Sequence, residues 1–168
     1  MDARSESEPA TMQNATTTER KSDRELVTTR AFNGPARIVF EAWTKPELFR
    51  QWWVPKSMGM SLLSCEMDVR VGGRYRLEFA HGDSQAAFFG TYKEVTPHSR
   101  LVWTNEESDE GSVTTVTFAE KGGKTLLVMH ELYPSKEALD AAGTGAADAM
   151  GETFGQLDEL LVVMRVKP

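Results

Sequence analysis

The last stretch of the chain, about Ala146–Lys167, repeats its apolar residues with the spacing of a helix. Steps of four, three, four and three residues separate Met150, Phe154, Leu157, Leu161 and Met164. This periodicity predicts one long amphipathic helix. Its polar face would carry Gln156, Asp158, Glu159 and Arg165. Gly151 and Gly155 each cost about 0.8–1 kcal/mol relative to Ala, so they indicate either close backbone packing against a sheet or space for a ligand beneath the helix.

Between residues 25 and 132 the pattern changes to short β-branched and alternating stretches separated by turn signals. The clearest alternation places Tyr75, Leu77 and Phe79 on one face and charged residues between them. Glycine-containing turns at 72–73, 81–83 and 121–123 indicate hairpins. Seven strands are predicted: 25–32, 60–69, 74–79, 85–95, one that starts at 101 and runs into 106–111, 113–119 and 125–132.

Two short helices are predicted between the first two strands. Pro35 suits the first position of a helix that ends near residue 44. Pro46 starts a second helix, which Pro55 closes. This second helix ends in Trp52-Trp53, which is either a plug of the core or part of a pocket wall, because aromatic side chains bury about 150–250 Å² each.

Together these patterns predict an α+β fold. A seven-stranded curved antiparallel sheet would wrap around the long C-terminal helix, and Ser135 would cap a short helical segment before it. Residues 1–24 contain no Val, Ile, Leu or aromatic residue. They cannot bury enough apolar surface to become ordered, so we expect a disordered tail over 1–24 and a single domain over 25–168.

Charge and cysteine content narrow the classes of protein. The chain has 19 basic and 25 acidic residues and a net charge of −6, which disfavours nucleic acid as a partner. Cys65 is the only cysteine, so no intrachain disulfide can form, as is typical of a reducing compartment. The longest strongly apolar run, 160–164, is too short to span a bilayer. We therefore expect a cytoplasmic protein without a membrane span.

Four segments carry a resemblance to a known family: TRAFNGPARIVFEAWTKPELFRQWW (29–53), CEMDVRVGGRYRLEF (65–79), GTYKEVTPHSRLVWT (90–104) and ETFGQLDELL (152–161). They resemble the SRPBCC, or START-like, superfamily and its helix-grip (Bet v 1-like) fold. Within it they are most similar to the bacterial family related to the C-terminal domain of the activator of the heat-shock-protein-90 ATPase. The resemblance implies binding of a small hydrophobic molecule, a cyclase-type activity, or binding to a chaperone. Ala149-Met150 departs from the Gly-Trp that relatives often carry, which leaves the ligand size open.

The residues offer little catalytic chemistry. His81, His98 and His130 lie on different predicted elements without the spacing of metal ligands, and we expect no metal and no cofactor. Cys65 is expected to be a core or wall residue. His130 and Glu131 end the last strand, and alternation allows only one of them to face a cavity. Glu131 shares the predicted face of Leu127 and Met129.

Three hypotheses remain open. The leading one is a non-catalytic protein that binds a small hydrophobic ligand, of lipid, polyketide or aromatic type, between the sheet and the C-terminal helix. The predicted lining is Trp53, Tyr75, Leu77, Phe79, Tyr92, Trp103, Leu127, Met129, Glu131, Met150 and Phe154. The second is a cyclase or dehydratase in which His130 or Glu131 acts with Tyr92, although a satisfied polar pair at a strand end explains His130 and Glu131 equally well.

The third hypothesis is a protein-interaction module with a chaperone-type partner. An acidic run, Glu106, Glu107, Asp109 and Glu110, falls in a predicted loop. It is either a solvated loop or a docking site for a basic partner. The chain would be a monomer, or a homodimer formed by pairing of an exposed hairpin edge.

Overall fold

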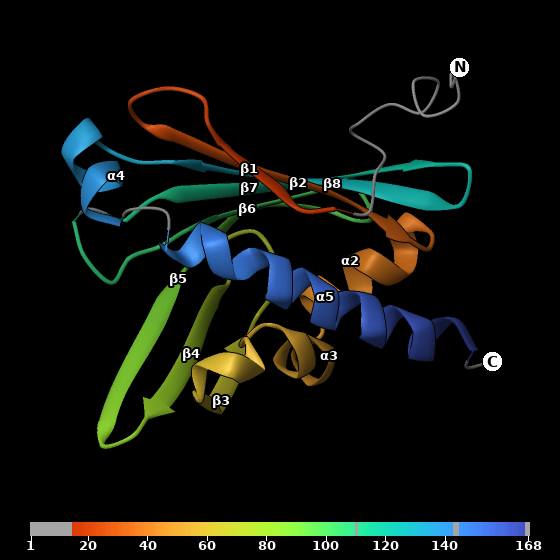
Figure 1. The fold of residues 1–168 in the computed structure, drawn as a ribbon, viewed down its shortest axis with the longest axis horizontal. Coiled ribbons are helices and arrows are strands. Elements are labelled where there is room, and N and C mark those ends of the chain that lie inside the picture. Colours follow the sequence, from red (N-terminus) through yellow and green to blue (C-terminus); the bar gives the residue numbers. More distant parts are fainter. Residues whose placement is uncertain (1–14, 110, 143–144, 167–168) are drawn as a thin grey trace, which may run out of the picture.

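A computed structural model gives the fold for residues 15–109, 111–142 and 145–166, with side chains in the last helix described over 150–164. One antiparallel sheet of eight strands curves around the long helix α5 (Gly145–Val166) (Figure 1). The strands are β1 (Thr17–Arg20), β2 (Glu25–Asn33), β3 (Ser61–Met67), β4 (Arg74–His81), β5 (Ser84–Thr96), β6 (Arg100–Thr104), β7 (Val113–Lys121) and β8 (Lys124–Leu132). Their order across the sheet is β1-β2-β8-β7-β6-β5-β4-β3. The predicted α+β helix-grip architecture is confirmed.

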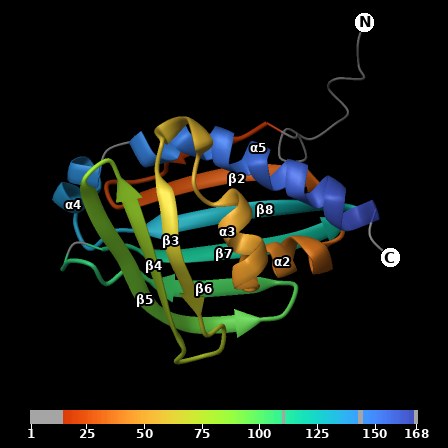
Figure 2. The same cartoon turned by 90° about the horizontal axis from the view of Figure 1, so that it is seen from below.

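The sheet bends at β5. This strand has 13 residues, and its pairing with β6 shifts register between Tyr92 and Glu94. Such an irregularity bends a strand and increases its twist. As a result, β3, β4 and the first part of β5 turn away from the layer formed by the other strands, as Figures 1 and 2 show. We call β3, β4 and β5 the bent arm.

The helical segments that follow β2 are short and lie beside α5 in the concave side of the sheet (Figure 2). They are α2 (Ala36–Thr44), α3 (Pro46–Trp52) and a 3-10 turn, η2 (Lys56–Met58); α4 (Lys136–Ala142) precedes α5. Pro35 is the residue before α2, and Glu120 caps that helix from the β7–β8 hairpin by accepting the Ala36 N–H at 2.9 Å. The Ser135 hydroxyl accepts the Ala138 N–H at 3.0 Å, which confirms the predicted cap of α4. None of the helices in these ranges is long and apolar enough to cross a membrane.

The apolar face predicted for α5 is confirmed, but its polar face is only partly so. Phe154, Leu157 and Leu161 are at most 1% exposed. Gln156, however, is also buried, because the segment after α3 covers a second side of the helix. Asp158 forms an ion pair with Arg30 of β2. Gln156 and Asp158 therefore make tertiary contacts, whereas Glu159 is exposed as predicted; the side chain of Arg165 lies outside the described residues.

Two expectations need correction at the N-terminal end. Thr17–Arg20 pairs with β2 as an antiparallel strand, so the sheet has eight strands instead of seven, and part of the segment expected to be disordered is in the sheet. All four β1 residues are exposed. Backbone pairing at a sheet edge holds them, and this needs no apolar side chains. The expectation for residues 1–14 lies outside the described residues.

Candidate aromatic ligand site

An aromatic cavity of about 80 Å³ lies between the bent arm and the helices α2 and α3. Its wall is mostly aromatic and comes from α2, α3, the four strands β3–β6 and the residues that directly follow α3 and β6. The lining residues are Trp43, Phe49, Trp53, Met67, Tyr75, Leu77, Phe88, Tyr92, Trp103 and Asn105. None of them carries a charge. A wider depression on the other face of β3 and β4 is lined by charged side chains, and there Arg74 and Arg76 already pair with acidic partners.

Three tryptophans, Trp43, Trp52 and Trp53, build the helical side of the cavity and its support, and Trp103 comes from β6. Trp43 lies with its ring centroid 5.8 Å from that of Trp53 and 6.0 Å from that of Trp103. Trp53 stacks on Phe49 at 4.8 Å. Trp52, by contrast, is fully buried, and its indole N–H donates to the Ala42 carbonyl at 2.9 Å. Of the predicted pair, Trp52 is therefore the core plug and Trp53 the pocket wall.

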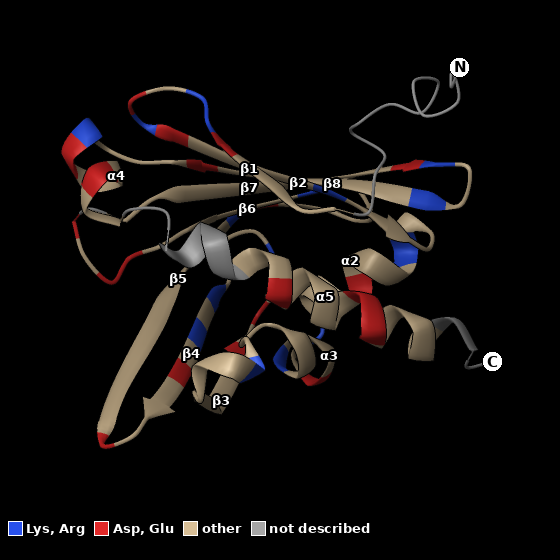
Figure 3. Ribbon diagram, in the orientation of Figure 1, with Lys and Arg blue, Asp and Glu red and all other residues tan. Residues whose placement is uncertain are grey.

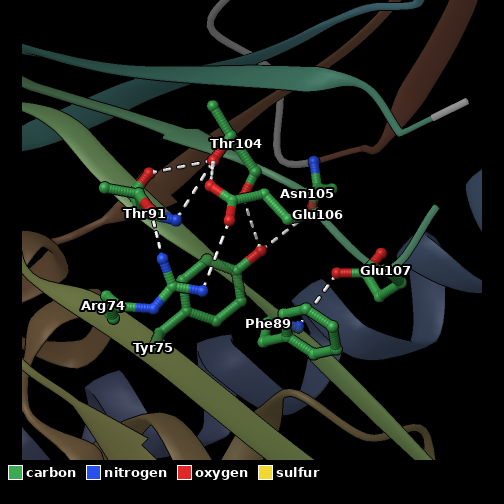
Figure 4. A network of polar contacts seen from close by, with 8 residues as sticks. All are labelled: Arg74, Tyr75, Phe89, Thr91, Thr104, Asn105, Glu106 and Glu107. Atoms are coloured by element: carbon green, nitrogen blue, oxygen red, sulfur yellow. Dashed lines mark hydrogen bonds and ion pairs between the residues drawn. The ribbon is translucent and has the colours of Figure 1, made fainter. Parts of the chain in front are cut away.

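The opposite end of the cavity is closed by a polar network (Figure 4). The Tyr75 hydroxyl lies 2.9 Å from the Thr104 carbonyl oxygen and 3.0 Å from Asn105 Oδ1. The Asn105 amide in turn donates to the Ser112 carbonyl at 2.8 Å. Burial raises the pKa of Tyr75 well above its usual value, so the hydroxyl stays protonated. Tyr75 and Asn105 thus satisfy one another and fix this end of the wall.

Gly90 permits this arrangement. A Cβ atom at residue 90 would lie 1.7 Å from the Thr104 carbonyl oxygen and 2.9 Å from Cε2 of Tyr75. Only glycine therefore allows β5 and β6 to approach here while the Tyr75 ring crosses above the backbone. A side chain would separate the strands or expel Tyr75 from the wall.

The acidic run after β6 folds back onto the bent arm (Figures 3 and 4). Glu106 pairs with Arg74 at 3.3 Å, and hydrogen bonds led by that from the Thr104 hydroxyl hold the pKa of Glu106 below its usual value. Glu107 accepts the Phe89 N–H at 2.9 Å. Glu106 and Glu107 thus hold this loop on the bent arm while staying exposed; Asp109 is exposed as well, and Glu110 lies outside the described residues. A docking site for a basic partner stays a prediction.

Comparison with known proteins shows the family to which this chain belongs. The sequence model of the family described as "Activator of Hsp90 ATPase homolog 1-like protein" matches residues 33–162, most of the chain. The chain belongs to this family. The resemblance seen in the sequence is thereby confirmed. No curated protein matches the chain.

Solved structures share the fold of this Hsp90-activator-like protein. Protein NE0264 from Nitrosomonas europaea is 22% identical, with 88% of this chain and 99% of that chain covered and a TM-score of 0.78. A protein from Rhodobacter sphaeroides is 23% identical, with coverages of 88% and 98% and a TM-score of 0.79. One from Staphylococcus epidermidis is 25% identical, with coverages of 90% and 96% and a TM-score of 0.73. At this level of identity the likeness concerns the fold.

The groups proposed for catalysis do not converge in this family member. His130 lies on the outer face of β8, where its ring bonds to Glu25 at 2.8 Å, and that bond lowers the pKa of Glu25. Glu131 lies on the inner face with Leu127 and Met129, as predicted. Its cross-strand row runs through Thr114 and Trp103 to Tyr92, which is three strand spacings, or about 14 Å. Burial raises the pKa of Glu131.

The eleven residues predicted to line a ligand cavity differ in their position relative to the aromatic cavity. Five lie on the wall of the aromatic cavity: Trp53, Tyr75, Leu77, Tyr92 and Trp103. Five are buried in the core away from it: Phe79, Leu127, Met129, Met150 and Phe154. Glu131 lies across the sheet. Because α2 and α3 lie between α5 and the bent arm, this cavity borders these short helices and no described side chain of the C-terminal helix; a ligand site beneath that helix stays a prediction.

The glycines of α5 neither pack closely on the sheet nor border the aromatic cavity. A Cβ atom at Gly151 or Gly155 would meet nothing within 4 Å, so neither packs closely on the sheet. No α5 residue with a described side chain lines the cavity, so they make no room for a ligand there.

The sequence analysis missed the other half of the wall: Trp43, Phe49, Met67, Phe88 and Asn105. Phe88 had a usable signal, because it alternates with Gly90 and Tyr92 on one face of β5. Within the described ranges no three His, Cys, Asp or Glu side chains gather to hold a metal ion.

Proposed function

We propose that this protein binds one small, ring-sized apolar molecule in the aromatic cavity, without reacting with it. The observation that carries this proposal is an uncharged, largely aromatic wall around about 80 Å³ of space. Usual ligand pockets measure about 300–1,000 Å³, whereas an apolar cavity of about 150 Å³ holds benzene. Among lipid, polyketide and aromatic ligands, the volume therefore favours a single aromatic ring.

The side chains support binding over catalysis. Burial raises the pKa values of Tyr75 and Tyr92 above their usual range, so neither phenol serves as a base near neutral pH. Glu131 lies about 14 Å from Tyr92 by strand count. A general base must be within hydrogen-bond reach of the proton it removes. The cyclase or dehydratase hypothesis thus has no base in the cavity wall.

The expected affinity is modest. A single ring that buries about 150 Å² at about 25 cal/mol per Å² gains about 4 kcal/mol, which corresponds to a dissociation constant near 1 mM. Edge-to-face contacts with the tryptophans add about 0.5–1.5 kcal/mol. A natural ligand in this cavity would therefore bind in the range from about 0.1 to 1 mM.

The test measures unfolding of the full chain in the presence of toluene, naphthalene or palmitate. Toluene at ten times its dissociation constant should stabilise the protein by about 1.4 kcal/mol, and palmitate should not. Leu77→Phe, which fills the wall, should abolish the toluene effect. Leu161→Phe adds the same volume to a buried position outside the cavity and is the matched control. Stabilisation by palmitate but not toluene would contradict the proposal, and so would capture of a chaperone by a protein that ignores every probe.

A further inference from the structure

The polar atoms of the cavity wall divide into those with partners and those without. Tyr75 and Asn105 bond to each other at 3.0 Å. The Tyr92 hydroxyl has no hydrogen bond to any residue that the structure describes, although only 4% of the residue is exposed. The Trp43 indole N–H is also buried without a partner. Trp43 Nε1 is enclosed by protein atoms, so the donor that the wall can offer to a ligand is the Tyr92 hydroxyl.

Tyr92 is held firmly in this position. Its ring lies 5.7 Å from that of Tyr75 and 6.4 Å from that of Trp103. It also lies at the register shift where β5 bends. The hydroxyl cannot leave the cavity for solvent without breaking these aromatic contacts. A ligand in the cavity therefore meets a preorganised donor, which lowers the entropy lost on binding.

The charge of the wall restricts the ligand. None of the ten lining residues is ionised at neutral pH. A carboxylate or ammonium group would lose its hydration there without gaining an opposite charge. The ligand is therefore neutral. The unbonded Tyr92 hydroxyl favours a ligand atom with lone pairs, and a carbonyl or hydroxyl oxygen supplies them.

We infer that the cavity takes a small neutral aromatic molecule with one carbonyl or hydroxyl oxygen, and that the Tyr92 hydroxyl binds this oxygen. This inference rests on the proposed function, because it concerns the same cavity. A bare ring fills the space but leaves the Tyr92 hydroxyl without an acceptor, whereas an oxygen-bearing ring supplies one.

Phenol and toluene test this directly, since they have the same number of heavy atoms and differ in one hydroxyl against one methyl group. Both are titrated by calorimetry into the wild type and into Tyr92→Phe. Phenol affinity should fall about threefold to tenfold in the variant, which is the effect of one hydrogen bond, and toluene affinity should stay the same. Tyr133→Phe is the matched control, because it removes a tyrosine hydroxyl outside the cavity wall; it should not weaken phenol.

Each outcome decides something. If Tyr92→Phe changes phenol and toluene affinity equally, the Tyr92 hydroxyl bonds to water instead of to the ligand, and the inference is overturned. Binding of toluene would then still support the proposed function. If neither probe binds the wild type, the proposed function itself fails. Should Tyr92→Phe not fold, the Cζ carbon of Tyr92, which bears the hydroxyl, gives a readout without a variant. Its chemical shift should move further with phenol than with toluene, and equal shifts would overturn the inference.

Discussion

Gln156 ties the cavity wall to α5, and its replacement should loosen both. Its amide N–H₂ donates to the carbonyls of Trp52 and Val54, each at 2.9 Å. Its carbonyl oxygen accepts the Lys56 N–H, also at 2.9 Å. The segment held in this way contains Trp53 and connects α3 to the bent arm. Gln156→Leu removes three hydrogen bonds at once and leaves three backbone groups without partners.

The expected cost follows from these contacts. At about 1 kcal/mol net for each bond, and with partial access of water to the freed groups, Gln156→Leu should lower the free energy of unfolding by about 2–3 kcal/mol. This corresponds to a urea midpoint lower by about 1–2 M. The Lys56 amide should also lose its protection from hydrogen exchange. Toluene should bind more weakly, because Trp53 is no longer fixed.

Glu159→Leu is the control for this experiment. Residue 159 is on the same helix but is exposed, and such surface changes are usually within about 0.5 kcal/mol. The reasoning would be refuted if Gln156→Leu shifted the midpoint no further than Glu159→Leu. It would also be refuted if the Lys56 amide kept its protection in Gln156→Leu.

Three further changes have definite expected outcomes. Gly151→Ala should raise the free energy of unfolding by about 0.8–1 kcal/mol, because a Cβ there meets open space. A lower free energy of unfolding in a urea titration would contradict this. Asp158→Asn should lower the free energy of unfolding by about 3 kcal/mol, because it leaves the guanidinium of Arg30, which is 8% exposed, without its charged partner. In a double-mutant cycle, adding Arg30→Met should recover much of this loss. Burial raises the pKa of Glu131 above its ordinary value of 4.5, so the folded state binds the proton more tightly and stability falls as pH rises through that range. Glu131→Gln should remove this fall, with a stability gain over wild type that grows from pH 4 toward neutral; parallel pH curves for the two proteins would contradict it.

The order of elements was predictable because periodicity is a local property of sequence. Alternation along β4 placed Tyr75 and Leu77 on one face, and both line the cavity. The 3.6-residue pattern placed Phe154 and Leu157 on the buried face of α5. Local patterns therefore identified the faces correctly, without showing what covers each face.

The position of the cavity was not predictable for that reason. It depends on the bend of β5 and on helices α2 and α3 lying between α5 and the bent arm. Gln156 looked like a solvent-facing residue because its partners, the backbone groups around residues 52–56, lie about a hundred positions away. The strand β1 had no apolar signal at all, since backbone pairing and a contact between the Thr18 and Thr28 hydroxyls join it to β2.

The central claim is that a single apolar ring binds between the bent arm and the short helices. The four tryptophan indole N–H signals in a nitrogen-15 spectrum test it most directly, because Trp43, Trp53 and Trp103 line the cavity and Trp52 does not. Titration with toluene should move the three wall signals in a saturable way and move the Trp52 signal least. No saturable shift, or a Trp52 shift as large as the others, would contradict the claim.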